Sequence, residues 1–244
     1  PVPTLDALAG RLQDSASQNS SVAIDWVQTG TRLGGHSCHL GRFSGSVGYD
    51  PSMIGTYGQP IRDAFEAEFG AYDLLSVGAP GETHAVEFED GKCMFAQAGS
   101  YIDFDWPSFR DAVSLETLTA RLDGARLFGI GYWLVIPRLP SLLTGLREEV
   151  WPTLSDPPDR ILLDTGDIRQ FESERIEAGI EPLERLDDVA EVTLSANRVE
   201  TLALANAVAG TDPDRDFVDA ATAVFDQLDV TRFVGHNVDF SLAL

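Results

Sequence analysis

The spacing of apolar residues along the first part of the chain predicts short helices and strands. Leu40, Phe43 and Val47 recur at helical spacing, so we expect a helix over residues 36–47. Between residues 82 and 96, apolar residues alternate with polar or small ones around Asp90-Gly91, a pair typical of hairpin turns, and this predicts an antiparallel hairpin. The other elements expected here are strands at 22–27, 52–54 and 74–77 and a helix at 60–69.

From residue 114 onward, predicted helices and strands alternate regularly. This order implies right-handed crossovers and a mostly parallel sheet with helices on both faces, so we expect a three-layer α/β/α fold. Ligands of such sheets bind beyond the carboxyl ends of the strands. The expected helices are 114–122, 140–150, 171–186, 197–209 and 213–228, and the expected strands are 125–129, 160–163, 191–194, 231–234 and 238–242.

The charge balance narrows the possible partners. The chain carries 39 acidic and 17 basic residues, a formal net charge of −22, and Lys92 is its only lysine. A protein this acidic repels phosphate backbones and anionic lipids, so nucleic acid and membranes are not expected as partners. The acids either bind metals or basic partners or adapt the surface to molar salt. Their spread over the whole chain favours a halophilic protein.

Length and cysteine content add two expectations. The 244 residues fit a single α/β domain spanning residues 1–244, and no apolar stretch is long enough to cross a membrane. No secretory signal opens the chain. Cys38 and Cys93 are the only cysteines, which is too few for a disulfide framework, so we expect a protein of the reducing cytoplasm.

Common catalytic signatures are missing from the sequence. Gly91-Lys92 is followed by cysteine and lies in the predicted hairpin, so it is no P-loop. Gly129-Ile130-Gly131 lacks the third glycine of a dinucleotide-binding fingerprint, and no nucleophile elbow is present. These absences argue against P-loop phosphotransferases, common dehydrogenases and α/β-hydrolases.

Three short segments carry candidate chemistry. His36-Ser37-Cys38-His39 is poorly spaced for metal ligation, because ligands within one helical turn point in different directions. Asp164 ends a predicted strand and resembles the nucleophile of a phosphatase, but the spacing to Asp167 is one residue too long for that motif, and a solvated turn is the simpler explanation. Asn197 and Glu200 face the same way at a predicted helix start. They fit phosphate and hydrated Mg²⁺ as well as an ordinary capping box, and spacing alone does not separate the two.

In their order along the chain, these features resemble the ribokinase-like sugar kinases, the group of ribokinase, fructokinase and the minor phosphofructokinases. The segment at 31–39 is similar to the family's Gly-Gly segment, and 47–58 to the stretch that follows it. The hairpin takes the place of the family's lid strands. Residues 164–169 resemble a segment containing Asp, Asn and Arg, with one residue inserted. Asn197-Arg198-Val199-Glu200 matches the family's Asn-x-x-Glu motif.

The resemblance implies a carbohydrate kinase that transfers a nucleotide phosphoryl group to a sugar hydroxyl. It implies Mg²⁺ with ATP or ADP as cofactors and a homodimer formed through a lid around residues 22–27 and 82–96. By this resemblance, sugar would contact Gly34, Gly35, His36 and His39, phosphate would contact Asn197 and Arg169, and Glu200 would hold the metal ion.

One family motif has no counterpart here. The Gly-Ala-Gly-Asp motif, which supplies an anion hole and the catalytic base, should follow Asn-x-x-Glu, but the only later glycines are Gly210 and Gly235. We therefore expect a family member without its C-terminal catalytic segment and assign no catalytic residue. The alternatives are a catalytically inactive sugar- or nucleotide-binding protein of the same fold and a phosphatase that uses Asp164.

Overall fold

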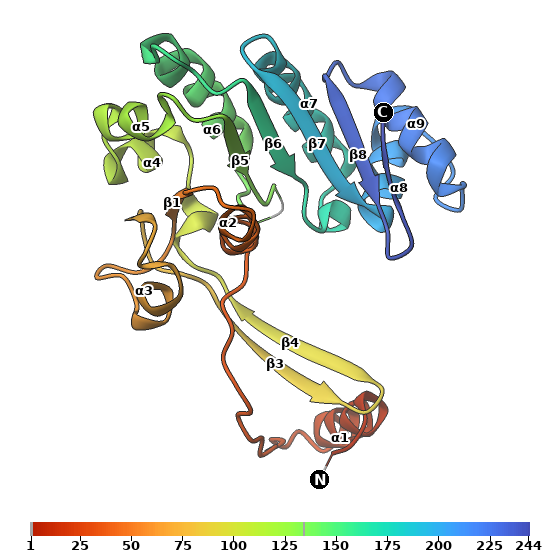
Figure 1. Ribbon diagram of the computed structural model, residues 1–244. Coiled ribbons are helices and arrows are strands. Elements are labelled where there is room, and N and C mark those ends of the chain that lie inside the picture. The colour runs from red at the N-terminus through yellow and green to blue at the C-terminus, as the bar shows by residue number, and fades with distance from the viewer. Residues whose placement is uncertain (1, 134) are drawn as a thin grey trace.

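The computed structural model describes residues 2–133 and 135–244, and it shows an α/β body from which a long hairpin projects (Figure 1). The body is built on a five-stranded sheet in the order β5-β6-β7-β8-β9. Neighbouring strands from β5 to β8 run parallel, as predicted, and β9 pairs with β8 antiparallel. The strands are β5 (Leu127–Ile130), β6 (Arg160–Asp164), β7 (Glu191–Asn197), β8 (Arg232–His236) and β9 (Ser241–Ala243).

One face of this sheet is the main hydrophobic core. Alternate residues of β6 and β7, such as Ile161, Leu163, Val192 and Leu194, are fully buried, as the twofold side-chain period of a strand requires. Four helices cover this face (Figure 1). They are α6 (Leu139–Gly145), α7 (Ser173–Asp187), α8 (Arg198–Ala209) and α9 (Phe217–Gln227), and a π-helical turn at Leu146–Val150 follows α6 where one continuous helix was predicted.

The opposite face is covered at β5 by α2 (His36–Ser46), which confirms the helix predicted there and the three-layer fold. This close approach depends on two glycines. A Cβ atom on Gly129 would lie 2.2 Å from Leu40 Cδ2, and one on Gly131 would lie 2.6 Å from His36 Cγ. The absence of side chains at these positions therefore lets α2 rest on the end of β5.

A smaller unit lies beside the sheet and has its own core. Its strands β1 (Ser52–Gly55) and β2 (Asp73–Ser76) pair in parallel, and α3 (Asp63–Phe69) connects them. The predicted start of α3 at Pro60 is wrong, because Arg62 N donates to Tyr57 O at 2.9 Å and residues 58–61 form a turn. The buried residues of this second core are Cys38, Met53, Tyr57, Phe65 and Phe69.

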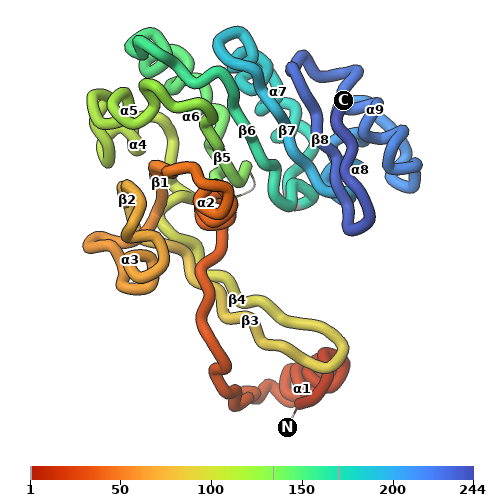
Figure 2. Tube along the Cα trace, viewed as in Figure 1, coloured from red at the N-terminus to blue at the C-terminus, as the bar shows by residue number. Residues whose placement is uncertain are grey.

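The projecting hairpin consists of β3 (Glu82–Phe88) and β4 (Gly91–Gln97) and confirms the antiparallel prediction. An N-terminal helix, α1 (Leu5–Ser17), packs at its tip, where Leu5 N donates to Asp90 Oδ1 at 2.7 Å. Figure 2 shows the chain returning from α1 beside the hairpin toward α2.

The strand predicted at 22–27 is wrong. These residues have no regular secondary structure, although the Trp26 ring stacks on His84 of the hairpin with centroids 5.8 Å apart. Ring stacking holds Trp26 against the hairpin, and among the described residues no backbone pairing adds this segment to the two-stranded sheet.

Two further helices precede β5. They are α4 (Trp106–Ala112), which the apolar pattern did not predict, and α5 (Leu115–Leu122), which it did. Asp105 and Ser108 form a capping box at the start of α4, with Ser108 N donating to Asp105 Oδ1 at 3.0 Å. Within the described part of the chain, no helix is both long enough and apolar enough to cross a bilayer.

Candidate functional site

A cavity of about 390 Å³ lies where the parallel strands end. Asp164, Asn197 and His236 are the last residues of β6, β7 and β8, and Tyr132 follows β5. Asn197 and His236 occupy paired positions in neighbouring strands, so their side chains leave the same edge of the sheet together. The described residues that line the cavity are Tyr132, Val135, Asp164, Gly166, Asp167, Asn197, Glu200 and His236.

The capping-box interpretation of Asn197 and Glu200 is confirmed, and their phosphate and Mg²⁺ roles stay a prediction. Asn197 Oδ1 accepts from Val199 N at 2.9 Å and from Glu200 N at 3.1 Å, and Glu200 Oε2 accepts from Asn197 N at 2.8 Å. These bonds form a complete capping box at the start of α8. Both side chains also line the cavity. The cap therefore occupies two first-turn amides that would otherwise face an anion, and it fixes the Glu200 carboxylate at the cavity wall.

Glu200 is the most deeply buried carboxylate of the site, with 7% of its surface exposed. Thr165 Oγ1 also donates to Glu200 Oε2, at 3.0 Å. Burial raises the pKa of Glu200 above its usual range, and the nearby negative charge of Asp164 adds to this, while the hydrogen bonds from Asn197 N and Thr165 oppose it. All the hydrogen bonds observed at this carboxylate fall on one oxygen, which leaves Oε1 as the atom that can take a ligand.

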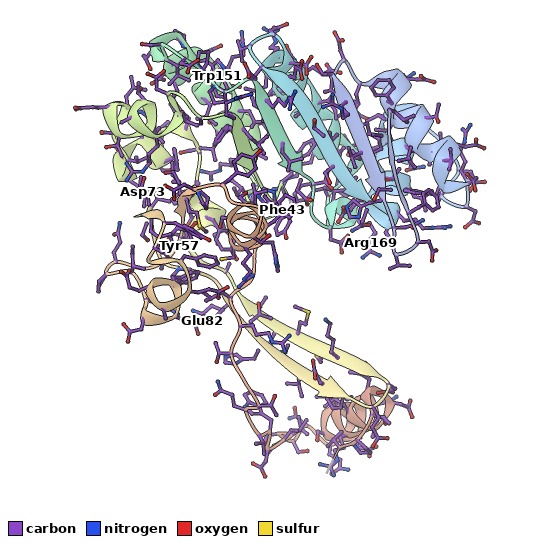
Figure 3. All side chains as sticks on the ribbon, viewed as in Figure 1. Phe43, Tyr57, Asp73, Glu82, Trp151 and Arg169 are labelled. Carbon is purple, nitrogen blue, oxygen red and sulfur yellow. The ribbon has the colours of Figure 1, made fainter. Side chains whose placement is uncertain are left out.

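In the segment after β6, some side chains line the cavity and others lie at the surface. Asp164 Oδ1 accepts from Gly166 N at 3.2 Å, and Asp164 and Asp167 both line the cavity. Arg169 instead lies outside it, with its guanidinium paired to both Asp167 oxygens at 2.6 and 2.7 Å. Figure 3 places Arg169 on the side of the body where β6 to β8 end. Arg169, the predicted phosphate contact, therefore lies near the cavity, but its guanidinium is already paired with the Asp167 carboxylate.

The four predicted sugar contacts do not line the cavity. Gly34 and Gly35 precede α2, and His39 Nδ1 lies 3.4 Å from Arg42 NH1. His36 comes closest, because its ring meets Tyr132 edge-on with centroids 5.5 Å apart. Burial lowers the pKa of His36, the Asp164 charge opposes this shift, and His39 adds to it. Through its contact with Tyr132, the His36 ring borders the cavity on its β5 side.

The donor set accommodates a hydrated magnesium ion. No group of three or more His, Cys, Asp or Glu side chains among the described residues could hold a metal ion alone. Mg²⁺ usually keeps several waters and is held by one or two carboxylates together with substrate phosphates. Glu200 Oε1 and the neighbouring Asp164 supply such a partial set, so the residues present fit an ion that arrives with a nucleotide.

Two polar residues of this site were missed by the sequence analysis. Tyr132 and His236 belong to no motif, but each lies at or just after the end of a parallel strand. Ligands bind beyond the carboxyl ends of parallel strands, and two of the predicted strands end at Gly129 and Val234. This rule could have identified Tyr132 and His236, because both lie just after those positions.

Comparison with known proteins adds independent findings. A family model for prokaryotic ketohexokinase matches residues 1–244. A ketohexokinase of Haloferax volcanii is 46% identical over 238 residues, which are 98% of this chain and 63% of the relative. The crystal structure of a phosphofructokinase-2 mutant from Escherichia coli aligns with a TM-score of 0.53 and 16% identity, over 85% of this chain and 65% of that one, and supports the fold. The chain thus spans less than two thirds of either protein.

Proposed function

The chain belongs to the prokaryotic ketohexokinase family, and on that premise we propose that the protein transfers the terminal phosphoryl group of a nucleotide to a hydroxyl of a ketohexose. The supporting observation is the cavity that gathers Asp164 and Asn197 at the carboxyl ends of two neighbouring parallel strands, with Glu200 in the first turn of α8. Phosphoryl transfer needs little covalent chemistry from the protein, and its catalysis is mainly positioning and charge stabilisation. The cavity supplies polar side chains held by a rigid sheet.

In this proposal the nucleotide phosphates lie beside Asn197, and Glu200 Oε1 holds the hydrated ion. Bound Mg²⁺ would neutralise charge on the phosphate oxygens of ATP or ADP. Thr165 and the backbone of Asn197 hold the other Glu200 oxygen, so the carboxylate cannot swing away. Arg169 reaches phosphate only after it leaves Asp167.

The sugar lies on the β5 side of the cavity, against His36. Gly34, Gly35 and His39 lie outside the described cavity lining, so their proposed contacts with sugar require α2 to close toward it, and the hairpin over residues 82–96 serves as the lid. In this arrangement, residues 1–244 act as one domain. No residue of the chain is assigned as the catalytic base.

A coupled phosphorylation assay in molar KCl tests the proposed activity. We expect transfer from ATP or ADP with Mg²⁺ to a ketohexose to be at least tenfold more efficient than to the matching aldohexose. Calorimetric binding of sugar and nucleotide without any transfer would support an inactive binding protein instead. Release of phosphate from sugar phosphates that is lost in Asp164→Asn would support the phosphatase.

The exposed side chains of the hairpin support a second copy of the chain as a partner. Met94 and Phe95 are exposed on β4, and Trp26 and Val27 are exposed beside it. A two-stranded hairpin is marginally stable without a covering surface. We expect wild-type protein to sediment as a dimer and Phe95→Asp to sediment as a monomer with an unchanged circular dichroism spectrum. A wild-type monomer at micromolar concentration would contradict this proposal.

The acidic surface supports a halophilic protein. With a net charge of −22, self-repulsion destabilises the folded state unless salt screens it, and the screening length falls to about 3 Å at 1 M salt. We expect the melting temperature to fall by about 10 °C or more between 3 M and 0.2 M KCl, which corresponds to several kcal/mol. Scanning calorimetry measures this, and a melting temperature that stays constant or rises would contradict it. The free thiols Cys38 and Cys93 support a cytoplasmic location.

A further inference from the structure

The cavity is acidic and offers an anion few positive groups. Asp164, Asp167 and Glu200 all line it, and His236 is the single basic side chain among the described lining residues. A nucleotide phosphate that enters this space must find hydrogen-bond donors close enough to offset repulsion from the carboxylates. The identity of those donors follows from which polar groups are already engaged.

Most of the donors at the strand ends are occupied. The amides of Val199 and Glu200 donate to Asn197 Oδ1, and the Gly166 amide donates to Asp164 Oδ1. The Arg169 guanidinium donates to both oxygens of Asp167. Neither the first turn of α8 nor the segment after β6 therefore presents a ready-made phosphate cradle.

Among the described lining residues, two side-chain donors remain side by side on the β8 side of the cavity. Asn197 uses its carbonyl oxygen for the cap, so its amino group is left for a ligand. His236 occupies the paired position on the next strand, and it is partly exposed to the cavity. A neutral imidazole keeps one N–H donor, so this role does not depend on protonation.

The remaining cavity hydroxyl lies on the other side of the site. Tyr132 follows β5, which is separated from β8 by β6 and β7. Strands in a sheet are about 4.8 Å apart, so the ends of β5 and β8 are roughly 14 Å apart. Tyr132 contacts His36 and therefore belongs to the proposed sugar side.

We propose that His236 is a nucleotide-binding residue that donates a hydrogen bond to the phosphate groups, with the Asn197 amino group beside it. This inference rests on the proposed function, because it assigns the nucleotide end of the same cavity. It adds a residue that no motif of the sequence identified, and it orients the substrates, with phosphates at β7 and β8 and sugar at β5.

Calorimetric titration with ATP, ADP and adenosine in molar KCl tests the assignment. We expect His236→Leu, which keeps the volume but loses the donor, to weaken ATP and ADP binding by about tenfold, as expected for a hydrogen bond to a charged group. Adenosine, which has no phosphate, should bind within twofold of wild type. His236→Gln, which keeps an N–H donor, should restore ATP and ADP binding to within about threefold.

Equal losses for adenosine and ADP would show a structural role and overturn the assignment, as would unchanged ADP binding. A measurement on the unaltered protein guards against misfolding of His236→Leu. The ring proton resonances of His236, identified by their absence from His236→Gln, should shift with ADP and not with adenosine.

The two proposals fail in different ways. If wild type binds ADP through His236 but transfers no phosphoryl group, the proposed activity is wrong and the assignment of His236 stands. If wild type phosphorylates a ketohexose but ADP binding is insensitive to His236→Leu, only the assignment is wrong. Wild-type protein that binds no nucleotide would overturn both.

Discussion

Glu200→Gln is expected to lower kcat for phosphoryl transfer by about a hundredfold. The change removes the negative charge that would hold a hydrated cation beside the nucleotide phosphates, and loss of such an interaction costs about 10²-fold in comparable sites. Glutamine can still accept from Asn197 N and Thr165 Oγ1, because glutamine also completes a capping box. The fold should therefore remain intact, and steady-state assays over a range of Mg²⁺ concentrations would measure the loss.

Glu181→Gln is the matched control for this change. Glu181 is an exposed residue of α7 that pairs with Arg185 one helical turn away, and such surface pairs contribute little to stability. We expect its kcat to stay within twofold of wild type. A Glu200→Gln enzyme with kcat within threefold of wild type and an unchanged Mg²⁺ requirement would show that Glu200 serves only as the cap of α8.

Gly131→Ala is expected to raise KM for the sugar at least tenfold and to destabilise the fold. The new methyl group would lie 2.6 Å from His36 Cγ and 2.9 Å from Nδ1, so the ring and the start of α2 must move. Overpacking of this kind typically costs about 1–3 kcal/mol. Because His36 borders the cavity through Tyr132, the same movement disturbs the proposed sugar side. Sugar KM and urea unfolding give the two readouts.

The cause of the destabilisation can be isolated with a second change. In Gly131→Ala combined with His36→Ala, the ring that clashes is absent, so the free energies of unfolding should be strongly non-additive and part of the loss should be recovered. Gly10→Ala serves as the control, since a methyl group there meets nothing within 4 Å and α1 should be unaffected or slightly stabilised. Additive losses at residues 36 and 131 would contradict the proposed contact.

The sheet was predictable because its burial follows the sequence period directly. Ile161, Leu163, Val192 and Leu194 alternate with less buried residues, and this pattern survives in the structure with the expected parallel order. The position of Asn197 and Glu200 at the sheet edge was predictable for a related reason. Parallel strands end at one edge, so polar residues that follow a predicted strand meet there.

Other features depend on capping and packing that periodicity does not express. α1 was overlooked because a serine-rich segment hides a helix that the Thr4 side chain caps, with Ala7 N donating to Thr4 Oγ1 at 3.1 Å. Residues 22–27 have strand-like apolar spacing, but Trp26 packs against the hairpin by stacking on His84, and no strand forms. Local pattern could not distinguish a paired strand from a chain that packs through one ring.

The candidate site shows the same division. Asn197 and Glu200 have a motif-like spacing because both belong to one helix start. His236 lies far from them in the sequence, at the end of β8, and only the register of β8 with β7 brings it to the cavity. Gly34, Gly35 and His39 were assigned by resemblance and border no part of the described cavity. Arg169 was assigned as a phosphate contact by resemblance, and its pairing with Asp167 is a side-chain interaction that sequence spacing does not determine.

A crystal structure of the protein with ADP and a ketohexose, grown in molar KCl with Mg²⁺, tests the proposed arrangement most directly. The ADP phosphates should lie in the 390 Å³ cavity within hydrogen-bond distance of Asn197 and His236, with the ketohexose on the Tyr132 and His36 side. Phosphates bound away from the ends of β7 and β8, or a sugar seated beyond reach of His36, would contradict it.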